Sequence, residues 1–153
     1  MMPGMERLLR IRDGVVAAMA PLPAEQVPAA EAEGRILAAP ALARVPAPPF
    51  TCSAMDGYAV RSVEVRGPCT LPISGAVYAG DLPPPLEERT TARIFTGATL
   101  PAGADAVVRS EAAGEQDGSV RFLEAARPRE NVREAGEDVA AGGLALPAGV
   151  RLG

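Results

Sequence analysis

The chain has 153 residues, enough for one domain of ordinary size with its own hydrophobic core. Its 16 glycines and 16 prolines exclude a plain helical bundle, because both residues break helices. The sequence contains no histidine, which excludes a Ser–His or Cys–His nucleophile pair and a histidine-based zinc site within this chain. The net charge of −4 argues against a general nucleic-acid or anionic-membrane surface.

The cysteines and the hydropathy pattern indicate in which cellular compartment the protein is expected. Cys52 and Cys69 do not form a C-x-x-C pair or a four-cysteine site, and two cysteines in a chain of this size are typical of reduced thiols. No apolar run approaches the roughly 18 residues of a membrane-spanning helix, and the N-terminus lacks the layout of a signal peptide. We therefore expect a cytoplasmic protein that binds neither nucleic acid nor a membrane.

The first fifty residues predict helices followed by a stiff crossover. Apolar residues recur at helical spacing over residues 5–19, and Pro21 and Pro23 end this predicted helix. Its apolar stripe is expected to pack in the core or against another subunit. A second, shorter helix is predicted over residues 28–33. The proline-rich segment 45–50 then favours an extended backbone and is interpreted as the boundary between two lobes.

From residue 51 onward the pattern changes to short apolar runs bounded by glycine, proline, aspartate or serine, which is typical of strands joined by turns. The predicted strands are residues 58–60, 71–73, 92–95, 106–108 and 120–123. Asp117 and Gly118, between the runs at 106–108 and 120–123, predict a hairpin turn. The fold class is therefore mainly β with N-terminal helices (α+β).

Three clusters, residues 53–60, 96–108 and 136–139, combine glycines with hydroxyl and acidic side chains. Glycine allows a sharp turn or a close approach of the backbone to a ligand. A neighbouring carboxylate or hydroxyl can take part in hydrogen bonds, and its oxygen can bind a hard cation. The same residues are also common in structural turns, in which aspartate bonds its own backbone. Residue types alone leave both interpretations open.

The order of these and other blocks along the chain is more informative. The blocks are residues 34–38 (GRILA), 53–59 (SAMDGYA), 96–98 (TGA), 103–108 (GADAVV), and 132–133 (VR) with 136–138 (GED). In these blocks and in their order, the sequence resembles the N-terminal part of the MoeA family, the molybdopterin molybdenumtransferases. The resemblance spans nearly the whole chain, and the block at residues 53–59 is its most specific part.

The resemblance implies a fold, an activity and partners. It implies irregular, coiled β-sheets in two lobes, followed in the family by an α/β domain and a small β-barrel that lie beyond residue 153. It implies insertion of molybdate into adenylated molybdopterin (molybdopterin-AMP) with Mg²⁺ and release of AMP. It also implies a homodimer and a MogA-like adenylyltransferase as a partner. We expect one lobe to contain residues 1–47 and 130–153 and the β-rich second lobe to contain residues 48–129.

The resemblance also carries site residues over by motif position. Asp56, Thr96 and Asp138 match family residues implicated in activity, and Asp56 is the candidate for holding a Mg²⁺-bound water. The candidates for binding the pterin substrate are Ser53, Gly57, Gly97, Arg133 and Glu137, and Glu111 is a weaker candidate.

Other interpretations stay open beside the enzymatic one. Asp56 and Asp138 can instead be turn caps. Cys52 stands where the family commonly has asparagine, which removes an amide from the start of the motif. The chain lacks the α/β domain that carries most of the family's pterin site, so we expect it to be inactive alone. A non-catalytic dimerisation or scaffold module is the alternative, and a stand-alone metal- or oxyanion-binding module is a third possibility.

Overall fold

The computed structural model of the chain describes residues 3–20 and 22–153. These residues form two compact units, one from Met1–Ala39 with Ala148–Gly153 and the other from Pro40–Pro147. The lobe limits predicted at 47/48 and 129/130 fall inside the second unit and stay a prediction.

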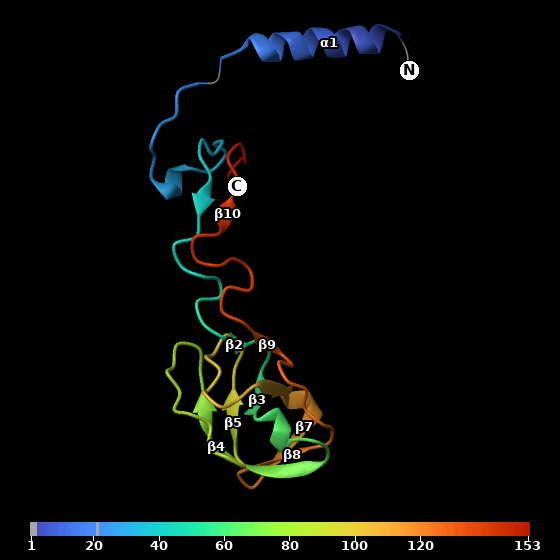
Figure 1. The fold of residues 1–153 in the computed structure, drawn as a ribbon, viewed down its shortest axis with the longest axis vertical. Coiled ribbons are helices and arrows are strands. Elements are labelled where there is room, and N and C mark those ends of the chain that lie inside the picture. The colour runs from blue at the N-terminus through green and yellow to red at the C-terminus, as the bar shows by residue number, and fades with distance from the viewer. Residues whose placement is uncertain (1–2, 21) are drawn as a thin grey trace. The chain divides into compact units, whose positions relative to one another are not determined.

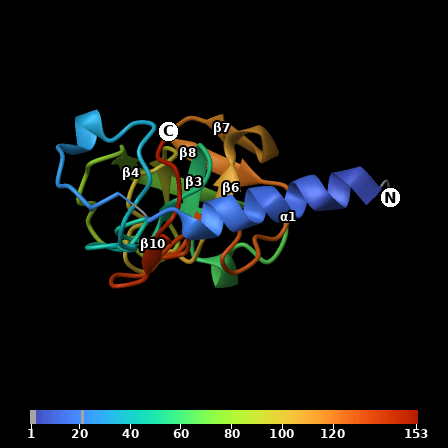
Figure 2. The ribbon, with the colours of Figure 1, turned by 90° about the horizontal axis from the view of Figure 1, so that it is seen from above.

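The first unit begins with helix α1 (Pro3–Ala18), which confirms the helix predicted over residues 5–19 (Figure 2). Pro21, predicted to help end it, lies outside the described residues. Every side chain of α1 from Met5 onward is exposed, including Leu8, Val15 and Val16 at 62%, 57% and 61%. The prediction that this helix packs in the core is therefore wrong within the described chain, whereas packing on another subunit stays a prediction. No described helix is both long enough and apolar enough to span a bilayer.

The second predicted helix, over residues 28–33, is wrong as an α-helix. The structure has only a 3₁₀ turn, η1 (Ala29–Glu31), with no buried residue. Six residues without a buried face cannot offset the cost of nucleating a helix. The described residues therefore contain one N-terminal α-helix instead of several. In the same unit, Ile36 and Arg151 form an antiparallel bridge, and the Leu37 N–H donates to the Val150 carbonyl at 2.9 Å.

The second unit contains a curled six-stranded sheet (Figure 1). The order across the sheet is β6-β3-β5-β4-β8-β7; β4 and β5 are parallel, and the other neighbours are antiparallel. The strands are β3 (Gly57–Val60), β4 (Cys69–Val77), β5 (Thr91–Ile94), β6 (Ala106–Arg109), β7 (Ala113–Gln116) and β8 (Ser119–Phe122). They confirm all five strands predicted from apolar runs. The predicted hairpin turn at residues 117–118 is present, but β6 pairs with β3, so the strands that this hairpin joins are β7 and β8. Its turn residues Asp117 and Gly118 both have positive φ, as a tight hairpin turn requires.

Both faces of β3 are covered, because all four of its residues are buried. On one side Tyr58 and Val60 pack with Val65 and Phe122. On the other side Ala59 packs with Ile94 and other small aliphatic residues. A strand buried on both faces reads as a continuous apolar run, which is why this segment was recognisable in the sequence.

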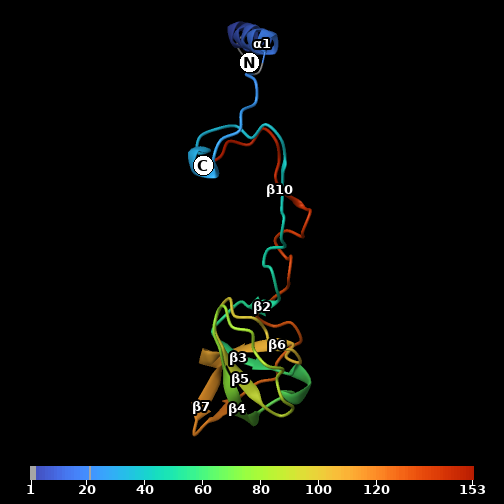
Figure 3. The same cartoon turned by 90° about the vertical axis from the view of Figure 1, so that its left-hand side faces the viewer.

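Outside the six-stranded sheet, two segments of this unit that are far apart in the sequence run side by side (Figures 1 and 3). Strand β1 (Ala41–Leu42) pairs with β10 (Leu144–Leu146), and Ala47 bridges to Val139. Strand β2 (Cys52–Ser53) pairs with β9 (Val132–Arg133) in antiparallel fashion. These short pairs bring the third sequence cluster to the first.

Candidate functional site

Strand direction gathers the first two clusters at one edge of the sheet. Strand β3 is antiparallel to both β5 and β6, so its beginning lies beside their ends. Asp56 comes directly before β3, Thr96 lies two residues after β5, and Ser110 directly follows β6. The Ser110 N–H donates to the Asp56 carbonyl at 3.1 Å, which fixes the backbone of Asp56 at this edge.

Asp56 and Thr96 are in direct contact through two hydrogen bonds. The Thr96 backbone N–H and its Oγ1–H donate to the same carboxylate oxygen, Asp56 Oδ1, at 2.8 and 2.7 Å. The backbone N–H first, and the hydroxyl second, lower the pKa of Asp56 below its usual range. No described residue donates to Asp56 Oδ2, and both side chains are exposed. The result is an ionised, oriented carboxylate with one oxygen open to a ligand.

The loop that follows Thr96 is held against β2. The Gly97 N–H donates to the Ser53 carbonyl at 2.9 Å, and the Ser53 N–H donates to the Ala98 carbonyl at 3.0 Å. Gly97 has a φ of +79°, and a Cβ built there would have no other atom within 4 Å, so the space beside it is open. Ser53 is buried, and its hydroxyl donates to the Met55 carbonyl at 2.6 Å. In this structure Ser53 shapes the loop that leads to Asp56; its role toward a ligand stays a prediction.

Gly57 has a steric reason to be glycine. A Cβ at this position would lie 2.1 Å from the Val108 carbonyl oxygen and 3.0 Å from the Arg109 Cα. Strand β6 therefore passes closer to β3 than any side chain allows. Its predicted role in substrate binding stays untested, because the close approach already explains the residue type.

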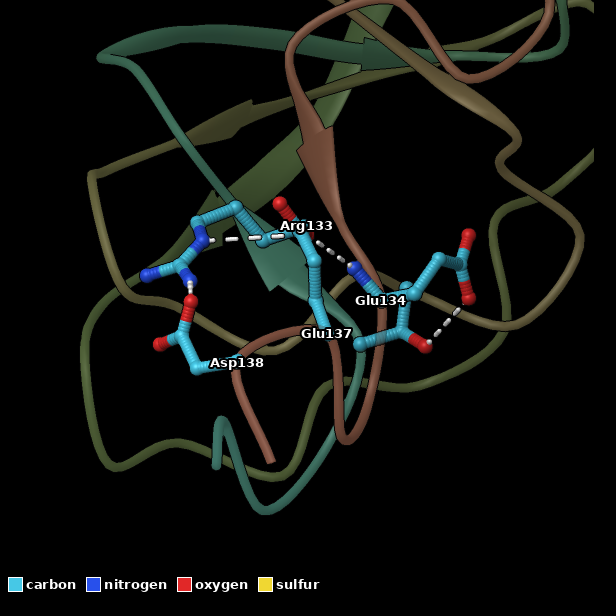
Figure 4. A network of polar contacts seen from close by, with 5 residues as sticks. Arg133, Glu134, Glu137 and Asp138 are labelled. Atoms are coloured by element: carbon cyan, nitrogen blue, oxygen red, sulfur yellow. Dashed lines mark hydrogen bonds and ion pairs between the residues drawn. The ribbon is translucent and has the colours of Figure 1, made fainter. Parts of the chain in front are cut away.

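The third cluster is built around Arg133 (Figure 4). The Arg133 Nη2–H donates to Asp138 Oδ1 at 2.5 Å, and Arg133 Nε lies 3.7 Å from Glu137 Oε2. Glu137 Oε2 also accepts the Glu134 N–H at 3.0 Å. The hydrogen bond and the charge of Asp138 raise the pKa of the Arg133 guanidinium. Since Arg133 pairs with Cys52 across β2 and β9, this network is anchored to the strand that also holds the Gly97 loop.

Cys52, the departure from the family pattern, is buried between these groups. Burial raises the pKa of its thiol, the charge of Arg133 opposes that rise and Glu137 adds to it. A buried thiol with a raised pKa is a packing residue and a poor nucleophile at neutral pH.

Most of the predicted residues are thus joined through β2, which has the Gly97 loop on one side and Arg133 on the other. Glu111 lies exposed in η3 (Ser110–Ala112), directly after β6. Within residues 3–20 and 22–153, no three cysteine or carboxylate side chains converge as a ready-made metal site. Sequence reasoning missed Tyr78 and Phe95, which stack at the same edge of the sheet. A signal existed, because Phe95 ends the predicted strand 92–95 and Tyr78 directly follows Val77, in a chain with only 3% aromatic residues.

Comparison with known proteins identifies a family and solved structures to which this chain is similar. Residues 6–153 match the model of the MoeA N-terminal region (domain I and II). The molybdopterin molybdenumtransferase of Haemophilus influenzae is 39% identical over 127 residues, which cover 80% of this chain and 31% of that protein. Molybdopterin molybdenumtransferase 2 of Mycobacterium tuberculosis is 40% identical over 126 residues, covering 78% and 31%. A crystal structure of a molybdopterin biosynthesis MoeA protein from Pyrococcus horikoshii superposes with a TM-score of 0.79 at 32% identity and covers 84% of this chain and 36% of that one.

The mainly β, curled architecture is therefore that of the N-terminal part of a molybdopterin biosynthesis protein. The chain belongs to the MoeA N-terminal region family. It spans about a third of the length of the curated relatives that it matches.

Proposed function

We propose that this chain is the N-terminal part of a molybdenum-cofactor biosynthesis enzyme that inserts molybdate into adenylated molybdopterin and releases AMP. The family match and the names of the relatives support the pathway. The observation that carries the proposal for this chain is the Asp56–Thr96 pair. It is an ionised carboxylate, fixed by two donors on one oxygen and open on the other, at an exposed edge of the sheet.

In this proposal Asp56 is the acidic group that faces the substrate, and Thr96 is a positioning residue. The Thr96 hydroxyl donates to Asp56, and the Gly97 N–H donates to Ser53, so neither donor is free for a phosphate or molybdate oxygen. Thr96 acts by orienting the Asp56 carboxylate and keeping it ionised. Arg133 lies on the other side of β2 and brings positive charge to the site, which the Asp138 and Glu137 carboxylates that hold it largely offset.

A magnesium ion fits this arrangement at Asp56. Mg²⁺ is commonly bound through one or two carboxylates, with water and substrate phosphates filling the rest of its shell. Asp56 Oδ2 offers one such oxygen, and within the described chain it does not belong to a cluster of three or more cysteine or carboxylate side chains. When bound, the ion would supply positive charge to the phosphate of the leaving AMP.

The proposal is tested with Asp56→Asn in a complete protein that carries this chain followed by the domains of its relatives. We expect turnover of adenylated molybdopterin to fall by about 100-fold or more, as for loss of a group that acts on the reacting centre. Asp117→Asn is the matched control, because it makes the same change in an exposed turn. The turn lies at the other end of β5 from Thr96: the Ile73 N–H donates to the Gly118 carbonyl, and Ile73 pairs with Thr91, the first residue of β5.

Two outcomes contradict the proposal. Unchanged turnover in Asp56→Asn, or a large loss of thermal stability with unchanged activity per folded molecule, makes Asp56 a structural cap. We also propose that the 153-residue chain alone does not turn over the substrate, and measurable insertion of molybdenum by it would refute that.

One observation favours assembly as a second role. The apolar side chains of α1, among them Leu8, Ile11 and Val15, are exposed, although their burial is worth about 1.5–3 kcal/mol each. This supports the proposed homodimer. The partners that we propose besides a second copy are the C-terminal α/β and β-barrel domains and a MogA-like adenylyltransferase that supplies the adenylated substrate. If the complete protein is inactive but dimeric, and loses the dimer on changes in α1, the scaffold alternative is correct.

A further inference from the structure

Two aromatic side chains lie at the sheet edge that carries Asp56 and Thr96. Strands β4 and β5 are parallel and end together, with Val77 opposite Ile94. Tyr78 and Phe95 are the next residues in this register, so they lie on the same side of the pair, opposite to the buried Val77 and Ile94. Their rings stack face to face, with centroids 4.8 Å apart and planes 10° from parallel.

This pair differs in burial, ring geometry and hydrogen bonding from the other aromatic pair of the described residues. Tyr58 and Phe122 are buried, meet edge to face at 84°, and the Tyr58 hydroxyl donates to Glu115 at 2.6 Å. Tyr78 is 56% exposed, and its hydroxyl forms no hydrogen bond with the described residues. Phe95 covers one face of the Tyr78 ring, so the exposed surface of this side chain includes the other face. The first pair is a core contact, whereas the second presents a flat apolar surface to solvent.

The backbone around Tyr78 is fixed before any ligand arrives. The Tyr78 N–H donates to Asp81 Oδ2 at 2.8 Å, and the Asp81 N–H donates to the Tyr78 carbonyl at 3.0 Å. The Phe95 N–H donates to the Val77 carbonyl at 3.2 Å, which ties the two strand ends together. An exposed aromatic ring held in this way loses little conformational entropy on binding.

We propose that Tyr78, supported by Phe95, is a substrate-binding residue that stacks on the flat heteroaromatic ring of the substrate, a ring of the purine or pteridine type. This inference rests on the proposed function, in which the substrate carries both rings. Strand β4 is two strands away from β3, so Tyr78 is about 10 Å across the sheet from Asp56. That span is of the order of one mononucleotide, so a phosphate near Asp56 and a ring on Tyr78 can belong to one molecule.

The first test follows Tyr78 by NMR in the 153-residue chain. The sequence has two tyrosines and no tryptophan, so the ring protons of Tyr58 and Tyr78 are easily separated, and buried Tyr58 is an internal reference. AMP, a simple pterin and ribose 5-phosphate are titrated separately. We expect AMP or the pterin to shift the Tyr78 ring protons while Tyr58 stays in place, and the more effective of the two identifies the ring. Ribose 5-phosphate, which has no aromatic ring, is expected to leave Tyr78 unchanged.

The second test compares Tyr78→Leu and Tyr78→Phe in the complete protein. Stacking of a base on an aromatic side chain is typically worth enough to change affinity by roughly 5- to 150-fold. Tyr78→Leu is therefore expected to raise KM by that factor with kcat little changed, and Tyr78→Phe is expected to keep the wild-type KM. Both variants should unfold within a few degrees of the wild type, because Tyr78 is at the surface.

The outcomes separate the inference from the proposed function. The inference is wrong if the wild-type protein is active, Tyr78→Leu has the wild-type KM, and neither AMP nor the pterin shifts the Tyr78 ring protons. The Tyr78–Phe95 pair is then only a packing contact between the ends of β4 and β5. If the complete wild-type protein is inactive, the proposed function fails, but a Tyr78 shift with AMP or the pterin would still establish the ring-binding surface.

Discussion

Gly57 offers the sharpest test of how the sheet positions the candidate site. The glycine stands between Asp56 and the buried strand β3, and a Cβ there would meet three backbone atoms of β6 at 2.1, 2.9 and 3.0 Å. Its backbone is not in the left-handed region, so Gly57→Ala introduces a clash and no dihedral strain. Because the atoms that it meets belong to the backbone of Val108 and Arg109, no side-chain rotation relieves the clash.

The size of the effect follows from the distances. Restoring an ordinary contact of about 3.4 Å to the Val108 oxygen moves the strands apart by more than 1 Å. That movement stretches a hydrogen bond of typical length, about 2.9 Å, beyond its useful range. Loss of two ladder bonds at about 1 kcal/mol each, together with strain of about 1–2 kcal/mol from overpacking, gives a loss of roughly 3–4 kcal/mol in the free energy of unfolding. That is a large part of the 5–15 kcal/mol typical of a domain.

The measurement is urea unfolding of the 153-residue chain, followed by far-ultraviolet circular dichroism. Gly114→Ala is the matched control, because Gly114 also lies in a strand, β7, but a Cβ there would have no neighbour within 4 Å. The control should be neutral or slightly stabilised, by up to about 1 kcal/mol. Equal unfolding midpoints for the two variants would refute the steric reasoning. In the complete protein, a Gly57→Ala variant that is as stable as the wild type but inactive would instead favour the predicted role in substrate binding.

Two further predictions concern hydrogen bonds that shift a pKa. Thr96→Val keeps the N–H that donates to Asp56 but removes the hydroxyl, so NMR titration should show a higher Asp56 pKa; an unchanged pKa would mean that the hydroxyl does not hold the carboxylate. Because the folded-state pKa of Asp56 is lowered, its stabilising contribution is present above roughly pH 4 and is lost as the pH falls through that pKa. In Thr96→Val this loss of stability at low pH should be smaller. Burial first and the Glu115 carboxylate second raise the pKa of Tyr58, so Glu115→Gln should lower it in an ultraviolet titration with Tyr78→Phe as background. Because the Tyr58 pKa is raised, its contribution is present below about pH 10 and is lost as the pH rises through the folded-state pKa; an unchanged Tyr58 pKa would contradict the role of Glu115.

The strands that sequence reasoning predicted are those whose signal is local. Strands β3, β5, β6 and β8 each lie within a residue or two of a predicted apolar run, because burial on the sheet selects those residues. Strand β7 was missed, since Ala113–Gln116 has no apolar run and pairs only at the edge of the sheet. Strand β4 reaches from Cys69 to Val77, beyond the predicted residues 71–73, because its pairing with β5 and β8 holds a segment containing Pro72 and Gly75 in line.

The candidate site was predictable in its residues but not in its contacts. The blocks named Asp56, Thr96 and Arg133, yet the bond from Thr96 to Asp56 spans 40 positions and depends on the antiparallel register of β3 and β5. The pairing of β2 with β9 joins two-residue strands that carry no pattern of their own. The helix predicted over residues 28–33 failed for the converse reason, because local signals there have no buried face to support them.

The charged side chains around Asp56 and β2 indicate that the candidate site needs additional positive charge to bind an anion. Around β2 the chain places four acidic groups, Asp56, Glu134, Glu137 and Asp138, against Arg133 and Arg129. Both arginines are already paired with carboxylates, since Arg129 Nη1 lies 2.8 Å from Glu134 and Arg133 bonds to Asp138. A molybdate or phosphate group brought to this edge would meet net negative charge. Its binding therefore requires further positive charge, which supports the proposals that Mg²⁺ binds at Asp56 and that another part of the complete enzyme closes the site.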